Sequence, residues 1–284
     1  MKTPGRIEPL VTEGLVDQVL RQLMSGKEAN VYVVQCGEEL RCAKVYKEAN
    51  KRGFHTATDY TEGRKTKNSR QARAMAKRSR YGRQEQEMAW QHAEVDALRL
   101  LAGVGVRVPT PYDFHEGVLL MELVADEDGE PAPRLNDVVL DEDTARRYHA
   151  DLVRQVVRML CAGVVHGDLS EYNVLVDRDG PVIIDLPQAV DAAANNNARR
   201  ILERDVANLA AYFGQFAPDL LGKDYGKEIW ALYESGKLHP DSPLTGVFRA
   251  DQPVSDLGEV LRIIEAAREE EDARQAGRAA AAEA

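Results

Sequence analysis

Apolar residues follow two kinds of spacing along this chain. In the first half they form short alternating or continuous runs, at 31–34 and from Leu40 to Tyr46, and turn-forming sequences precede both runs. Such runs predict β-strands. Upstream of them, five apolar residues recur at helical spacing and predict that the chain opens with a helical region: Leu15, Val16, Val19, Leu20 and Leu23.

Two charged residues interrupt otherwise apolar patterns. Lys44 alternates in phase with the apolar residues of the second strand, and Glu94 falls on the apolar face of a helix predicted over Glu85–Leu101. An unpaired buried charge is costly, so the two patterns predict a Lys44–Glu94 ion pair. The alternative is that Glu94 lies at the edge of the apolar face, in water.

The rest of the chain alternates between a strand, loops and helices. The apolar run Val118–Val124 predicts a strand, and the acidic stretch Ala125–Arg134 after it predicts a connector. Asp141 is a suitable N-cap for the helix that follows. Further helices are predicted from Ile201 to Phe213, over 227–235 and over 257–271, with a frayed or disordered tail after 273.

The most informative motif is His166-Gly167-Asp168-Leu169-Ser170-Glu171-Tyr172-Asn173, which reads H-x-D-L-x-x-x-N. Enzymes of the protein-kinase type use this pattern, in which Asp168 would be the catalytic base and Asn173 a magnesium ligand. Two short strands with a turn at 177–180 predict a hairpin that returns Asp185, the second magnesium ligand, to the level of Asn173. Lys44 would then contact the nucleotide phosphates. The alternative is two acids and an amide beside a surface hairpin.

Composition limits the class of protein. With 284 residues and 44% hydrophobic residues, the chain is long enough for a bilobed enzyme with a substantial core. No stretch has the length of a membrane span, and the N-terminus lacks the pattern of a signal peptide. The odd number of cysteines, without metal-type spacing, predicts reduced core residues in a cytoplasmic protein: Cys36, Cys42 and Cys161.

Charge is distributed unevenly. The net charge of −10 argues against a protein that coats nucleic acid, but no acidic residue occurs from Arg64 to Arg83, where nine residues are basic. This segment belongs to an insert of about 50–84 that has little apolar surface to bury. It is either a solvated, flexible insert or a contact for an acidic partner, RNA or a ribonucleoprotein.

These blocks, in this order, resemble the RIO family of atypical serine/threonine protein kinases. The resemblance rests on Ser25–Tyr32, on Lys44, on Glu94, on the catalytic motif and on Arg204–Asn208. It implies an α+β, bilobed, protein-kinase-like fold with a β-rich N-lobe (1–124), a reduced helical C-lobe (125–272) and a tail (273–284). It also implies ATP and Mg²⁺ as cofactors and phosphate transfer to a protein hydroxyl or to the chain itself.

The same resemblance implies roles for further residues. Ser25 and Lys27 would contact the phosphates, and backbone groups of Glu122 and Val124 would bind adenine. Asp185 would be a candidate phosphate acceptor as well as a metal ligand.

Three positions depart from the family pattern: Gly167 in place of alanine, Pro187 in place of a small hydroxyl residue, and the run Asn195–Asn197. They leave the substrate open. A small-molecule phosphotransferase of the aminoglycoside or choline type and an ATPase-type ribonucleoprotein assembly factor are the alternatives.

Overall fold

The computed structural model describes residues 2–47 and 80–248, and of residues 80–90 the backbone alone. The chain divides into two compact units, Met1–Val247 and Phe248–Ala284. Every described helix and strand lies in the first unit. The predicted helix over 257–271, the tail and most of the basic insert lie outside the described residues.

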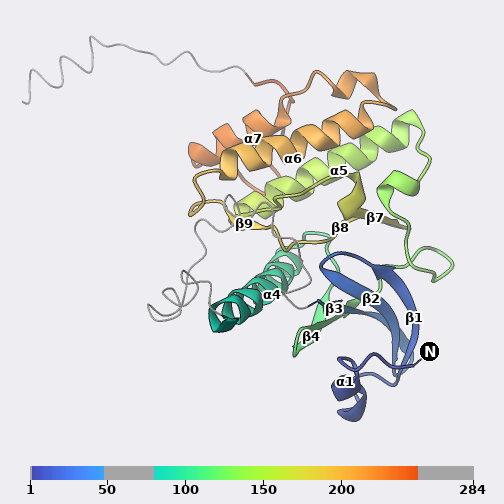
Figure 1. The fold of residues 1–284 in the computed structure, drawn as a ribbon. Helices are drawn as coiled ribbons and strands as arrows, with labels where there is room; N and C mark the ends of the chain where they lie inside the picture. Colours follow the sequence, from blue (N-terminus) through green and yellow to red (C-terminus); the bar gives the residue numbers. More distant parts are fainter. Residues whose placement is uncertain (1, 48–79, 249–284) are drawn as a thin grey trace, which may run out of the picture. The chain divides into compact units, whose positions relative to one another are not determined.

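A five-stranded antiparallel sheet forms the first part of the fold (Figure 1). Its strands follow the order β1-β2-β3-β5-β4, with β4 and β5 entering after the helix α4. The predicted strands at 31–34, 40–46 and 118–124 are all present. The elements are α1 (Glu8–Thr12), β1 (Gln18–Ser25), β2 (Ala29–Cys36), β3 (Glu39–Tyr46), α4 (Arg80–Gly103), β4 (Pro111–His115) and β5 (Val118–Glu122).

The prediction of a helix over Leu15–Leu23 is wrong, because no residue of that segment is helical and the helix α1 ends before it, at Thr12. The segment runs into strand β1, which pairs with β2 through two irregularities, between Val19 and Arg21 and between Gln22 and Met24. These irregularities break the strict two-residue alternation, and Val19 is the buried residue of the strand while Leu20 is exposed. Pairing with a neighbouring strand, which the local pattern does not contain, therefore decided the outcome.

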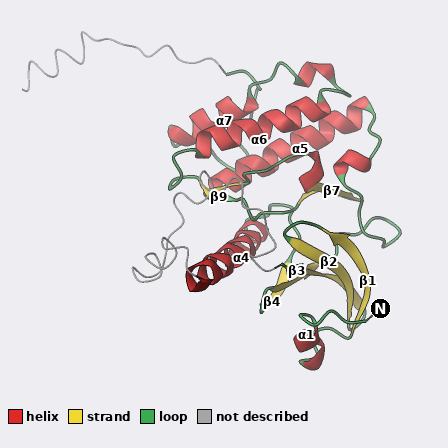
Figure 2. Ribbon diagram, viewed as in Figure 1, coloured by secondary structure: helices red, strands yellow, loops and turns green. Residues whose placement is uncertain are grey.

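Three helices pack together in the second part of the fold (Figure 2). They are α5 (Glu142–Cys161), α6 (Ala198–Phe213) and α7 (Tyr225–Glu234), with short 3-10 turns at η2 (Leu135–Asp137), η3 (Glu171–Asn173) and η4 (Pro218–Leu220). Asp141 caps α5 as predicted, since its Oδ1 accepts a hydrogen bond from the Thr144 N–H at 2.7 Å.

Two small antiparallel pairs flank the H-G-D-L-S-E-Y-N segment. The predicted hairpin is β7 (Val174–Asp177) with β8 (Gly180–Ile183), and β6 (Val164–Val165) pairs with β9 (Val190–Asp191). The segment from His166 to Asn173 therefore leaves one pair and enters the other. Both of its ends are fixed by backbone hydrogen bonds, which favours a rigid loop.

The buried apolar residues form separate core clusters. One core cluster lies between α1 and the sheet and includes Ile7, Leu10, Val34 and Leu120. The largest cluster joins α4 to the three helices and to the segment around Leu169. All three cysteines are free, and Cys42 is buried, but Cys161 is exposed at the end of α5, so its prediction as a core residue is wrong. Within the described part of the chain, no helix is long and apolar enough to cross a membrane.

Candidate active site

The predicted pair between Lys44 and Glu94 is present and buried. Lys44 Nζ lies 2.6 Å from Glu94 Oε1, and the Tyr46 hydroxyl donates a hydrogen bond to Glu94 Oε2 at 2.5 Å. Glu94 is 2% exposed, so the alternative of a carboxylate in water at the edge of α4 is excluded. Burial alone would lower the pKa of Lys44, but Glu94 and Asp185 outweigh it and raise that pKa well above its ordinary value.

Lys44 also contacts Asp185, which follows strand β8. Its Nζ lies 2.9 Å from Asp185 Oδ1. Burial would raise the pKa of the Asp185 carboxyl, but the charge and hydrogen bond of Lys44 lower it below its usual value. Asp185 has a φ of 65°, a left-handed conformation that is costly for a residue with a Cβ. Such conformations cluster at functional sites.

Asp168 and Asn173 lie on one loop and contact each other. The Asn173 Nδ2 donates to the backbone oxygen of Asp168 at 2.8 Å and lies 3.3 Å from its Oδ2. Gln188 Nε2 approaches the same Oδ2 at 3.5 Å. Burial raises the pKa of Asp168, and the charge of Arg204 opposes that rise. Both amide contacts thus converge on Oδ2 and orient the carboxylate.

His166 joins the loop to the end of β8. The Asp168 N–H donates to its Nδ1 at 3.2 Å, and its Nε2 lies 3.0 Å from the Ile184 oxygen. A ring whose Nδ1 accepts carries its proton on Nε2, so Nε2 donates to Ile184. The Ile184 N–H in turn donates to the Asn173 oxygen at 3.0 Å. The residue before Asp185 is therefore held against both Asn173 and His166.

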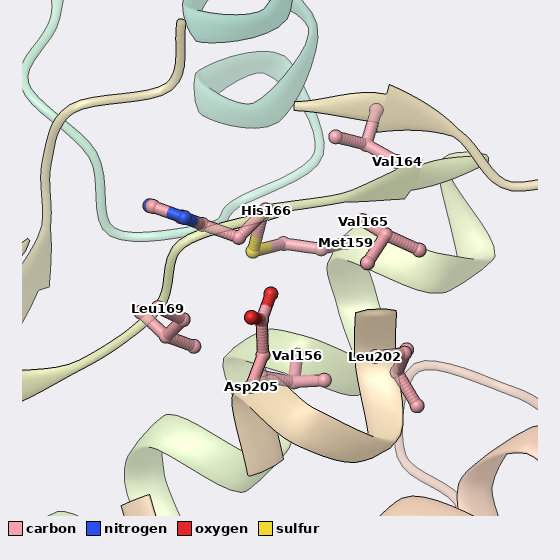
Figure 3. A pocket seen from close by; sticks show the side chains of 8 residues that line it. All are labelled: Val156, Met159, Val164, Val165, His166, Leu169, Leu202 and Asp205. Atoms are coloured by element: carbon pink, nitrogen blue, oxygen red, sulfur yellow. The ribbon is translucent and has the colours of Figure 1, made fainter. Parts of the chain in front are cut away.

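Asp205 on α6 forms hydrogen bonds that fix the loop from His166 to Asn173. Its Oδ2 accepts a hydrogen bond from the Gly167 N–H at 2.8 Å, and Arg204 contacts both the Gly167 oxygen and Asp205 Oδ1. Figure 3 shows the Asp205 carboxylate at a small pocket beneath this loop, lined mainly by apolar side chains and by His166. Burial raises the pKa of Asp205, and the hydrogen bonds from Arg204 and from the Gly167 N–H oppose that rise.

No role was assigned to Asp205 from the sequence. The available signal was an acid in phase with the apolar residues of α6: Ile201, Leu202, Val206 and Leu209. This is the same kind of signal that identified Glu94 on α4.

Gly167 has a conformation that favours glycine. Its φ is +91°, and a Cβ added there would lie 2.3 Å from the Gln188 oxygen. The departure from alanine at this position therefore accompanies a close approach between the loop and the segment after Asp185.

Ser25 and Lys27 belong to the turn between β1 and β2. The turn is closed by a hydrogen bond from the Gly26 N–H to the Ala29 oxygen at 2.9 Å, and Ser25 Oγ donates to Asn30 Oδ1 at 2.8 Å. Lys47 Nζ donates to the Gly26 oxygen at 2.5 Å. The Ser25 and Lys27 side chains are exposed. The turn is thus fixed while its two predicted phosphate contacts face solvent.

Glu122 and Val124 lie at the end of β5 and just beyond it. The Glu122 N–H donates to the Thr110 oxygen, and the Val124 oxygen accepts from the Ala132 N–H, both at 2.9 Å. Val124 also packs with Ala132, Val182 and Leu175 in a small apolar cluster. An adenine contact at this position would use the Glu122 oxygen and the Val124 N–H.

The donor set for a divalent cation is small. Within the described ranges, no group of three or more His, Cys, Asp and Glu side chains is gathered as a metal site. Asn173 directs its Nδ2 to Asp168, which leaves its Oδ1 as a ligand atom, and the lowered pKa keeps Asp185 anionic. An amide oxygen and a carboxylate suit Mg²⁺, which keeps much of its water and takes further ligands from phosphates.

Comparison with known proteins finds a matching family model. The family model described as "RIO domain" matches residues 30–225 of the 284 in the chain. The match begins inside the Ser25–Tyr32 block and includes every other residue assigned above.

Three curated relatives are serine/threonine-protein kinases by name. "RIO-type serine/threonine-protein kinase Rio1" of Haloferax volcanii is 36% identical over 78% of this chain and 71% of its own length. The Rio1 kinase of Methanocaldococcus jannaschii is 32% identical over 74% and 70%. Human "Serine/threonine-protein kinase RIO1" is 29% identical over 72% of this chain and 34% of its own length.

Proposed function

Because this chain belongs to the RIO domain family, we propose that it is an ATP-dependent serine/threonine kinase whose reaction takes place around Lys44, Asp168 and Asp185. The expected α+β, protein-kinase-like fold agrees with the five-stranded sheet, the helical part and the family match. The observation that carries the proposal is the position of Lys44, which contacts Glu94 on one side and Asp185 on the other.

In this proposal Asp168 is the general base. Its Oδ2 is oriented by the amides of Asn173 and Gln188, so Oδ1 accepts the proton of the attacking hydroxyl. A carboxylate with a raised pKa is a better proton acceptor than an ordinary one. Transfer then places the phosphoryl group on the substrate oxygen and the proton on Asp168, and ADP leaves.

The phosphates of ATP would be positioned by Lys44 directly and by Asn173 and Asp185 through Mg²⁺. Lys44 reaches them once ATP competes with Asp185 for its ammonium group, while Glu94 keeps the lysine in place. Asn173 and Asp185 would hold Mg²⁺, which supplies charge neutralisation at the phosphates when bound. Ser25 and Lys27 would contact the phosphates, and the Glu122 oxygen and Val124 N–H would bind adenine. We assign these roles to an N-lobe over 1–124 and a C-lobe over 125–272.

The identity of the phosphate acceptor separates this proposal from a small-molecule phosphotransferase. The experiment incubates the protein with γ-labelled ATP and magnesium, alone and with a protein extract, an aminoglycoside or choline. Label on serine or threonine of the protein itself or of an added protein supports the kinase. Label only on the amino-sugar or on choline contradicts it.

The basic segment Arg64–Arg83 supports a second, additional proposal of RNA or ribonucleoprotein binding. It rests on the nine basic residues without an acidic one, since such a run attracts phosphates. Affinity for RNA should fall steeply with salt and should disappear when the segment is deleted. Undiminished RNA affinity of the deletion variant would contradict it. An ATPase-type assembly factor would further require that RNA or a ribonucleoprotein stimulates ATP hydrolysis without phosphate transfer.

A further inference from the structure

Arg134 ends the connector between the sheet and the helices, and hydrogen bonds hold its backbone against the β7–β8 hairpin. It forms an isolated antiparallel bridge with Leu175, and the adjacent Pro133 oxygen accepts a hydrogen bond from the Val176 N–H at 2.9 Å. Leu175 is two residues after Asn173. The Arg134 backbone is therefore fixed beside the strand that follows the proposed magnesium ligand.

The Arg134 side chain reaches toward the sheet. One guanidinium nitrogen, Nη2, lies 3.0 Å from the Sδ of Met24, the residue that precedes Ser25 in β1. The side chain thus spans the distance from β7 to the start of the turn that holds Ser25 and Lys27. It therefore lies between the strand that follows Asn173, the proposed magnesium ligand, and the turn of Ser25 and Lys27, the proposed phosphate contacts.

The contact that Arg134 makes is a weak one for a cation. A thioether is a poor hydrogen-bond acceptor, and a guanidinium satisfies its donors far better with a carboxylate or a phosphate. Within residues 2–47 and 80–248, the side chain of Arg134 has Met24 as its hydrogen-bond partner and forms no ion pair. By contrast, Arg21 in β1 does have an acid partner in the connector, Glu130, at 2.5 Å.

The charge of Arg134 also reaches the site. Burial raises the pKa of the Asp185 carboxyl, Lys44 lowers it most, and Arg134 adds to that lowering. Lys44 shares its positive charge between two carboxylates, so it cannot by itself offset the several negative charges of a triphosphate. A further cation near Asp185 would be useful there, and Arg134 supplies one.

We propose that Arg134 is a further nucleotide-binding residue, whose guanidinium exchanges the Met24 sulfur for the phosphates of ATP. The exchange replaces a thioether, which is a weak and neutral acceptor, by a phosphate. A phosphate is anionic, and the planar guanidinium can bind it through two of its nitrogens. This inference rests on the proposed function, since it takes ATP as the ligand of the site.

The test measures the affinity of the full chain for ATP and for adenosine, both with magnesium, by calorimetry. The variants are Arg134→Gln, Arg134→Lys and, as the matched control, Arg21→Gln. Arg134→Gln should weaken ATP binding by about tenfold or more, the usual effect of losing a charged hydrogen bond, and should leave adenosine binding within about twofold. Arg134→Lys should bind ATP with intermediate affinity, because lysine keeps the positive charge but cannot form the two parallel hydrogen bonds of a guanidinium. Arg21→Gln should bind both like the wild type.

Adenosine binding also reports whether the variant site is folded. An equal loss of ATP and adenosine binding in Arg134→Gln and Arg134→Lys would overturn the inference and indicate a structural role. Unchanged ATP binding in both variants would overturn it as well. In both outcomes the wild type still binds ATP, so they leave the proposed function standing. A wild type that binds neither ligand would instead contradict the proposed function.

Discussion

Lys44 Nζ lies 2.9 Å from Asp185 Oδ1, although 141 residues separate the two in the sequence. The same ammonium group contacts Glu94 at 2.6 Å. Lys44 on the sheet therefore joins α4 to Asp185, which follows the β7–β8 hairpin. Glu94 is buried and Asp185 is half exposed, so in the proposed site Glu94 is the fixed partner of Lys44 and Asp185 is the partner that ATP would replace.

Removing the lysine should impair both stability and turnover. Lys44→Ala leaves the Glu94 carboxylate buried without its cation, which costs about 3–5 kcal/mol of the free energy of unfolding. It also takes a positive charge from the phosphates, so the rate of ATP use should fall. Chemical denaturation and a phosphorylation assay measure the two effects.

Glu94→Gln is the milder variant for comparison, because it keeps the shape and loses the charge. It should reduce turnover less than Lys44→Ala does. Wild-type phosphorylation by Lys44→Ala would contradict the role of this pair.

Gly167 should resist replacement by the alanine found in other family members. Gly163 provides the control, because its φ of +79° resembles that of Gly167 at +91° but a Cβ there would meet nothing within 4 Å. Gly163→Ala should cost roughly 1–2 kcal/mol from its conformation alone. Gly167→Ala should cost roughly 1–3 kcal/mol more because the Cβ would press on the Gln188 oxygen.

Gly167→Ala should also lower the rate of transfer, because Gln188 contacts Asp168 Oδ2. Thermal unfolding and kcat of the two variants test this together. Equal stability and equal kcat in the two variants would refute the importance of that close approach.

His149 should make stability depend on pH. It is 2% exposed on α5, its Nε2 has no hydrogen-bond partner within the described residues, and burial lowers its pKa from 6.5 to about 4, with Asp219 opposing. The unfolded chain keeps the ordinary pKa of about 6.5 and so binds more protons between pH 6.5 and 4. The free energy of unfolding should therefore be complete above pH 6.5 and fall by roughly 3 kcal/mol as the pH falls to 4.

The variant His149→Leu should flatten that dependence, since it removes the titrating group and keeps an apolar side chain between α5 and its neighbours. His239→Gln, at an exposed position, is the control. Denaturation curves measured from pH 7 to 4.5 give the comparison. Parallel pH curves for wild type and His149→Leu would rule out His149 as the cause.

Asp185→Asn should abolish magnesium-dependent turnover, because an amide offers one neutral oxygen in place of an anionic ligand. If Asp185 is also the phosphate acceptor, the wild type should carry a hydroxylamine-labile phosphate after incubation with ATP, and the variant should not. Phosphate analysis before and after hydroxylamine treatment tests this. Phosphoserine that resists hydroxylamine, with no labile phosphate, would exclude the acceptor role and leave the ligand role.

Local patterns predicted much of the fold and of the site. The cap at Asp141 and the β7–β8 hairpin each depend on a pattern visible within a short window. Lys44 and Glu94 lie 50 positions apart, but each interrupts the apolar repeat of its own segment, and the two interruptions together predicted the pair. They are therefore predictable from local physical chemistry.

What the patterns missed depends on distant partners. Strand β1 is stabilised by β2 through an irregular register, and the contact between Lys44 and Asp185 needs the whole fold. The hydrogen bond from Gly167 to Asp205 likewise joins residues 38 positions apart. Spacing within one segment does not contain these partners.

The most direct test compares the wild type with Asp168→Asn in two measurements, the affinity for ATP and the rate of phosphate transfer to serine or threonine. Losing a general base usually slows a reaction by roughly 10²–10⁴-fold. We expect Asp168→Asn to bind ATP within about twofold of the wild type, because its proposed role is at the substrate hydroxyl and not at the phosphates, and to transfer phosphate at that reduced rate. An undiminished rate of transfer, or an equal loss of binding and transfer, would contradict the role of Asp168 as the base.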